Sequence, residues 1–227
     1  MPDFPLDSFS LLQGVAPDEL AALRLLLTEK TFARREVVLT RGETGPGLGF
    51  LLEGRLQGVD FTVDGREVGL YFVEPGDYFG ELPVVDGRPG AEFIIAVAKA
   101  KVLFLPRERA RTLIFSSPEI AEKVMCRLAD RVRSVTAQRI LLSLPNPFQR
   151  LCVQLLQLVP EGGATIASAP THQELAIMIN TSRETVTRAF QLLQNREILR
   201  RESNQIQLLD RQFLLDIAEG RLDPPKN

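Results

Sequence analysis

The chain has 227 residues, of which 44% are hydrophobic, and its formal net charge is −2 at pH 7. This length fits one large or two modest domains, and the charge excludes a uniformly basic protein while allowing a locally basic surface. With two cysteines, one histidine, no run of about 20 apolar residues and no leader pattern, we expect a cytoplasmic protein that lacks disulfides, a membrane span, haem, an iron–sulfur cluster and other metal sites.

The first half of the chain changes from helical to β-rich patterning. Residues 7–30 are expected to form short helices, because Pro17 begins a run with leucines at helical spacing. Between about 31 and 105, short β-rich runs alternate with glycine turns, and the Asp64 and Gly65 dipeptide is a strong hairpin signal. The runs are 36–39, 48–52, 56–59 and 68–72. This pattern predicts a β-sandwich or jelly-roll barrel.

A long helix is predicted after the β-rich region. Ser117 suits its N-cap and Pro118 its first turn. Its apolar seam, at helical spacing, consists of Ile120, Val124, Leu128, Val132 and Val135. The seam fits a coiled-coil dimer, and a core helix of a monomer is the alternative. Segment 143–147, which holds two prolines, is predicted to end the helix and to form a hinge.

Two helix signals separated by a turn follow the hinge. Thr171 and Glu174 have capping-box spacing, and Asn180 suits a left-handed turn position. Ser182 is a good N-cap for the second helix. The apolar face of that helix holds Val186, Ala189, Phe190 and Leu193, and the opposite face holds Arg183, Glu184, Thr187, Arg188 and Gln191. Arginine can donate to guanine and glutamate can accept from cytosine, so the pattern favours a DNA-binding helix-turn-helix over a merely solvated face.

The end of the chain predicts a wing beside this motif. Runs 197–201 and 205–209 are expected to form its two strands, and 212–220 a final helix. Arg200 and Arg201 on the wing could contact phosphates, which position a protein on DNA without specifying sequence.

Residues 171–176 together with Ser-Arg-Glu-Thr-Val-x-Arg at 182–188 resemble the cyclic-AMP receptor / fumarate-nitrate reduction regulator (CRP/FNR) family of bacterial transcription regulators. The resemblance implies that Arg183 and Arg188 contact guanines of a TGTGA-like half-site and that Glu184 contacts a cytosine. It implies phosphate contacts from Thr171, His172, Gln173 and Ser182. It also implies a homodimer that binds double-stranded DNA, with RNA polymerase as a further partner.

The order of glycines between 42 and 80 resembles the family's cyclic-nucleotide-binding β-roll. Gly80 and Glu81 match the start of its phosphate-binding cassette, where the family holds a ribose hydroxyl. Leu82 beside them is a further candidate effector contact. Thr136 on the long helix is another, because some members draw effector contacts from a Thr-Ser pair in that neighbourhood.

The cassette departs from the family pattern at its phosphate-binding end. The Arg-Ser or Arg-Thr pair of cyclic-nucleotide binders falls at Gly90 and Ala91, which have neither charge nor hydroxyl. Arg88, two residues earlier, is the candidate replacement. Losing a charge-assisted bidentate contact argues against tight cyclic AMP binding. Cyclic di-GMP, another small anion and no effector at all stay open.

The sequence therefore predicts an α+β protein with three segments. These are an effector-sensing jelly-roll β-roll at 1–115, a dimerisation helix at 116–143 and a winged helix-turn-helix at 144–227. The predicted function is sequence-specific DNA binding by a homodimeric regulator. The alternatives are an effector-independent regulator of the same family, or a ligand- or protein-interaction module with an unused DNA domain. An enzyme is not expected, because the chain has no metal-ligand cluster, Gly-x-Ser-x-Gly motif or Walker loop.

Overall fold

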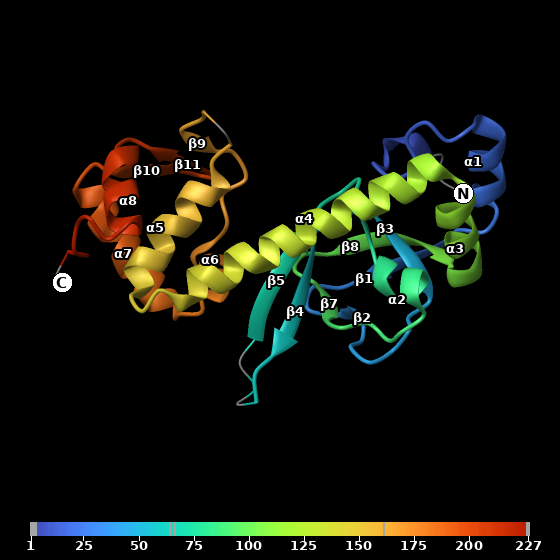
Figure 1. The fold of residues 1–227 in the computed structure, drawn as a ribbon, viewed down its shortest axis with the longest axis horizontal. Coiled ribbons are helices and arrows are strands. Elements are labelled where there is room, and N and C mark those ends of the chain that lie inside the picture. Colours follow the sequence, from blue (N-terminus) through green and yellow to red (C-terminus); the bar gives the residue numbers. More distant parts are fainter. Residues whose placement is uncertain (1–3, 64, 66, 161, 226–227) are drawn as a thin grey trace. The chain divides into compact units, whose positions relative to one another are not determined.

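The computed structural model describes residues 4–63, 65, 67–160 and 162–225, and the chain forms two compact units (Figure 1). Unit 1 comprises residues 1–131 and unit 2 residues 132–227. The division falls inside the long helix α4 (Pro118–Ser143), whereas the sequence-based boundaries treated that helix as a separate segment. Sheets and helices are both present in each unit, which confirms the predicted α+β class.

Unit 1 is built from two antiparallel four-stranded sheets. The first has the strand order β1 (Thr28–Phe32), β8 (Ala100–Pro106), β3 (Gly47–Glu53) and β6 (Tyr78–Phe79). The second has the order β2 (Val37–Leu39), β7 (Phe93–Ala96), β4 (Leu56–Phe61) and β5 (Glu67–Val73). The predicted hairpin joins β4 to β5, with Gly65 at a φ of 76°, while Asp64 lies outside the described residues.

Alternating side chains divide the core of unit 1 into two layers. On β3, Leu51 packs between the two sheets, whereas Leu48 and Phe50 face the helices that cover the first sheet. The covering elements are a 3₁₀ turn (Leu6–Ser8), α1 (Pro17–Arg24), α3 (Arg107–Ser116) and the start of α4. Strands β3 and β8 of this sheet are therefore buried on both faces, while a short helix, α2 (Glu81–Asp86), follows β6.

One strand begins inside the segment predicted to be helical. β1 starts at Thr28, although residues 7–30 were expected to form short helices. The expectation of helix is wrong for residues 28–30, because the backbone of β1 pairs with β8. Phe32 is the one buried side chain of β1. A strand with exposed polar side chains has no apolar alternation to reveal it.

Helix α4 begins as predicted, but its seam is buried only in part. The Ser117 hydroxyl accepts a hydrogen bond from the Ile120 amide at 3.4 Å. Ile120 and Val124 are buried in unit 1, whereas Val132 and Val135 of unit 2 are 66% and 69% exposed. The second half of the seam is thus apolar surface.

The described residues of unit 2, 132–160 and 162–225, form helices and a three-stranded sheet. Besides the end of α4, the helices are α5 (Pro147–Leu158), α6 (His172–Met178), α7 (Arg183–Asn195) and α8 (Arg211–Ala218). The strand order is β10 (Leu199–Glu202), β11 (Gln205–Leu208) and β9 (Thr165–Ile166), so the predicted wing forms and gains a third strand. In the described parts of the chain, no helix is long and apolar enough to cross a membrane.

Candidate nucleic-acid interface and effector pocket

Helices α6 and α7 form the predicted helix-turn-helix, and local hydrogen bonds fix both helix starts. The Thr171 amide donates to Glu174 Oε2 at 2.6 Å, and the Glu174 amide donates to Thr171 Oγ1 at 3.2 Å. This reciprocal pair confirms the capping box. Asn180 has a φ of 50°, as expected for the turn, and Ser182 Oγ accepts from the Thr185 amide at 3.2 Å.

The two faces of α7 separate as the sequence indicates. Its apolar side chains, Val186, Ala189, Phe190 and Leu193, are buried in the core of unit 2. Arg183, Glu184 and Arg188 are exposed on the first two turns. The backbone N–H of Glu184 and then the Ser182 hydroxyl lower the pKa of the Glu184 carboxyl, so this side chain is an acceptor at neutral pH. Exposed cations and an anion at a helix start can contact base edges and phosphates.

His172 lies against α7. Its Nδ1 is 3.0 Å from Thr187 Oγ1, and its ring centroid is 4.6 Å from that of Phe190. Burial, followed by the charges of Arg201 and Arg183, lowers the pKa of His172. The imidazole is therefore neutral at physiological pH, and the phosphate contact implied by the resemblance stays a prediction.

The other predicted DNA-binding residues have different surroundings. Thr171, Gln173 and Ser182 are exposed near the starts of α6 and α7. Arg200 is exposed on β10, with Glu202 Oε1 at 3.9 Å. The guanidinium of Arg201 instead turns inward: Nη2 donates to the Pro170 carbonyl at 3.0 Å, and burial lowers its pKa.

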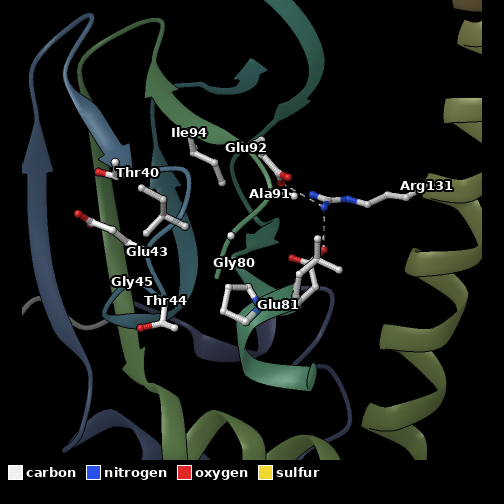
Figure 2. Close-up of a pocket in the computed structure, with 14 residues that line it drawn as sticks. Thr40, Glu43, Thr44, Gly45, Gly80, Glu81, Ala91, Glu92, Ile94 and Arg131 are labelled. Atoms are coloured by element: carbon white, nitrogen blue, oxygen red, sulfur yellow. Dashed lines mark ion pairs between the residues drawn. The ribbon is translucent and has the colours of Figure 1, made fainter. Parts of the chain in front are cut away.

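Most of the predicted effector contacts of the cassette line a pocket in unit 1 (Figure 2). Gly80, with a φ of 78°, leads into α2, and a Cβ there would lie 3.2 Å from the Gly47 carbonyl oxygen. Leu82, Gly90 and Ala91 also line the pocket. Glu81 is fully buried, and among the described residues neither carboxylate oxygen accepts a well-aligned hydrogen bond, although Arg131 lies at ion-pair distance from Oε1.

Two predicted effector residues are placed elsewhere. Arg88 is exposed and is not a lining residue of this pocket, and its backbone amide donates to Asp86 Oδ1 at 2.9 Å. Thr136 belongs to unit 2, where its hydroxyl donates to the Val132 carbonyl at 2.9 Å.

An arginine outside the sequence-predicted set forms ion pairs with two carboxylates of the pocket. Arg131 Nη1 lies 3.0 Å from Glu81 Oε1 and 3.7 Å from Glu92 Oε1, and Figure 2 shows the arginine reaching from α4 between the two carboxylates. The guanidinium of Arg131 stacks on the Tyr71 ring, with Cζ 3.9 Å from the ring centroid. The Tyr71 hydroxyl donates to Glu92 Oε1 at 2.6 Å. Burial raises the pKa of Tyr71 far above its usual value. Arg131 follows buried Val124 by seven residues. This heptad spacing places Arg131 on the same face of α4 as Val124, and it was the sequence signal that could have identified Arg131 as a pocket residue.

These residues fit the hydroxyl groups of a cyclic nucleotide but not its cyclic phosphate. The buried Glu81 oxygens can accept hydrogen bonds from ligand hydroxyls. Among the described residues that line the pocket, the charged groups are three carboxylates, Glu43, Glu81 and Glu92, and one guanidinium, Arg131, which is already ion-paired. This charge balance does not fit a cyclic phosphate. Within the described ranges, no group of three histidine, cysteine or acidic side chains could hold a metal ion.

Comparisons with known proteins agree with both parts of this description. A model of the cyclic nucleotide-binding domain matches residues 29–117, and a model of the Crp-like helix-turn-helix domain matches residues 149–217. The chain is 32% identical over 213 residues to a CRP-like cAMP-activated global transcriptional regulator of Mycobacterium tuberculosis, covering 90% of this chain and 94% of the relative.

Two further relatives extend the likeness over the chain. Identity is 27% to a cyclic AMP receptor protein of Thermus thermophilus, covering 92% of this chain and 97% of that protein. The solved structure of FixK2 from Bradyrhizobium japonicum has the same fold, with a TM-score of 0.69 and 21% identity over 88% of this chain and 99% of that one.

Proposed function

This chain belongs to the CRP/FNR family of transcription regulators, and we propose that it acts in the cytoplasm as a homodimer that reads a TGTGA-like palindrome, without catalytic activity. The observation that carries the proposal is the arrangement of α7. Arg183, Glu184 and Arg188 stand exposed on one face of a helix whose other face is held in the core. Such a helix can enter the major groove with its polar face toward the bases.

The side chains on α7 divide the recognition between them. Arg183 and Arg188 donate to O6 and N7 of guanines, and ionised Glu184 accepts from a cytosine amino group. Thr171, Gln173, Ser182 and Arg200 hold phosphates, supported by their exposure around the helix starts and the wing. His172 and Arg201 add positive or polar character at the edge of the interface, although their inward contacts make them the weaker members of the set.

Dimerisation through α4 is supported by its exposed apolar side chains. Met125, Val132 and Val135 are all more than 60% exposed, and with Leu142 they follow the a and d spacing of a coiled coil. Burying this stripe against the same stripe of a second copy removes apolar surface from water. It also supplies the two α7 helices that a palindrome requires. RNA polymerase is the further partner that a transcription regulator of this family would contact.

The chemistry of the pocket restricts which effector unit 1 can bind. The relatives' names point to cyclic AMP, and the buried Glu81 carboxylate supports a ligand with hydroxyl groups. The acidic lining near Gly90 and Ala91 argues against tight binding of cyclic AMP. Cyclic di-GMP carries two phosphates and meets the same obstacle. An effector-independent regulator is therefore the alternative that the pocket favours.

Fluorescence anisotropy of a labelled TGTGA palindrome tests the DNA-binding proposal. We expect the wild-type chain to bind with an affinity that falls steeply with salt, and Arg183→Ala to weaken binding about tenfold or more, in line with ~1–3 kcal/mol for a bidentate base contact. Arg196→Ala is the matched control, because Arg196 follows the last residue of the same helix and lies far from its start. Equal binding by Arg183→Ala, Glu184→Ala and wild type would favour an interaction module with an unused DNA domain.

A further inference from the structure

We propose that Thr187 reads a thymine of the half-site through its methyl group, and that His172 holds the Thr187 side chain in the orientation that does so. The inference rests on the DNA-binding function proposed above and adds to it a specificity-determining atom and a positioning residue.

The hydroxyl of Thr187 is already used inside the protein. It has a single proton, which it donates to the Arg183 carbonyl oxygen at 2.9 Å. The contact of 3.0 Å between Thr187 Oγ1 and His172 Nδ1 therefore needs its proton from the histidine. His172 is thus the Nδ1–H tautomer, and its ring is a donor to the threonine.

These two bonds determine what Thr187 can offer to DNA. With Oγ1 held between the Arg183 carbonyl and the His172 ring, the remaining substituent of the side chain is its methyl group. Thr187 is partly exposed, and it lies one turn after Arg183 and Glu184 on the same face of α7. Arg183 and Glu184 can pair with hydrogen-bonding groups of the bases, whereas Thr187 presents an apolar methyl group. In the major groove, the apolar feature of the bases is the C5 methyl of thymine, which a threonine methyl can contact.

The surroundings of His172 keep it in a fixed position. Its ring packs on Phe190, which is fully buried in the core of unit 2, with ring centroids 4.6 Å apart and planes tilted by 36°. Arg201, on the wing, places its guanidinium 5.8 Å from the same Phe190 ring. His172 therefore connects a rigid core residue to the DNA-facing side of α7, and its role is to restrict the rotation of Thr187.

A scan of thymine-to-uracil replacements in the palindromic duplex tests the proposal, because uracil lacks only the C5 methyl. We expect one symmetric pair of thymines at which uracil weakens wild-type binding about fifteenfold, because the pair loses two methyl contacts of ~0.8 kcal/mol each. Thr187→Ser keeps the hydroxyl and removes the methyl, so it should bind thymine and uracil equally at that position. Thr187→Val keeps a methyl group and should retain part of the discrimination.

The positioning role of His172 has its own readout. His172→Ala should reduce the thymine-to-uracil ratio toward one, while the penalty for changing a guanine of the half-site stays as in wild type. A purely structural role would lower the affinity for every duplex by the same factor and leave the ratio unchanged, which would refute positioning by His172.

The remaining outcomes separate this inference from the function on which it rests. Specific binding of the palindrome with no uracil-sensitive thymine, or with an equal ratio in Thr187→Ser and wild type, overturns methyl reading and leaves the regulator function intact. Absence of sequence-specific binding in wild type overturns both. Thermal melting of each variant, compared with wild type, identifies any loss of folding.

Discussion

Restoring the missing phosphate contacts should convert the pocket of unit 1 into a cyclic AMP site. The change is the double substitution Gly90→Arg with Ala91→Ser. The backbone at Gly90 allows it, because a Cβ there would lie 3.4 Å from the Glu43 carbonyl oxygen and 3.9 Å from that of Thr40, which are ordinary contacts. Both positions line the pocket that contains Glu81.

The size of the effect follows from the charges in the pocket. A hydrogen bond to a charged group contributes about 1.5–3 kcal/mol, or roughly tenfold to a hundredfold in affinity. The carboxylates of Glu43 and Glu92 compete for the new guanidinium, so we expect a gain near the lower limit, about tenfold.

Isothermal titration calorimetry with cyclic AMP measures this gain. Arg88→Ala is the matched control, because its side chain is outside the pocket lining, and it should leave the affinity of wild type unchanged. Equal affinity of the double variant and wild type would refute the reasoning, and so would loss of wild-type binding in Arg88→Ala.

Three further predictions concern groups whose charge depends on burial. Arg131→Met should lower the free energy of unfolding of unit 1 by about 3–5 kcal/mol, because it leaves the buried Glu81 carboxylate unpaired, and adding Glu81→Gln should recover most of the loss. Urea unfolding followed by tyrosine fluorescence measures this in unit 1 alone, since both tyrosines lie there and the chain has no tryptophan; a loss below about 1 kcal/mol contradicts the ion-pair argument. The lowered pKa of His172 means that below pH ~6.5 the unfolded chain binds a proton that the folded chain does not, so acidification from pH 7.5 to 5.5 should destabilise wild type more than His172→Gln in thermal melts. Equal pH dependence of the two proteins would contradict this. Burial raises the pKa of the Cys152 thiol to about 12, so the Cys126→Ser variant should not react with a disulfide reagent at pH 8 until it is unfolded; rapid reaction of the folded variant would show that Cys152 is accessible.

The helix-turn-helix was predictable because its signals are local. Thr171 and Ser182 cap helices that start within one or two residues of them, and Asn180 adopts the left-handed conformation that its side chain tolerates. The apolar face of α7 repeats at helical spacing, so the sequence alone distinguishes the buried side of this helix from its exposed side.

The charge cluster of the pocket depends on contacts between distant parts of the chain. Tyr71, Glu81 and Arg131 come from β5, α2 and α4, Glu92 directly precedes β7, and no short-range pattern links the four. The polar strand β1 was missed for a related reason. Its strand conformation depends on backbone pairing with β8, which lies about 70 residues later in the chain.

The central claim, that side chains of α7 read the bases of a palindrome, is tested most directly by a cycle between protein and DNA substitutions. Replacing one of the guanines in each TGTGA half-site with adenine should cost wild type about 1–3 kcal/mol per half-site in anisotropy titrations. We expect Arg183→Ala to lose this penalty at one guanine position while Arg196→Ala keeps it. An undiminished penalty in Arg183→Ala and Arg188→Ala at every guanine would contradict base reading by this helix.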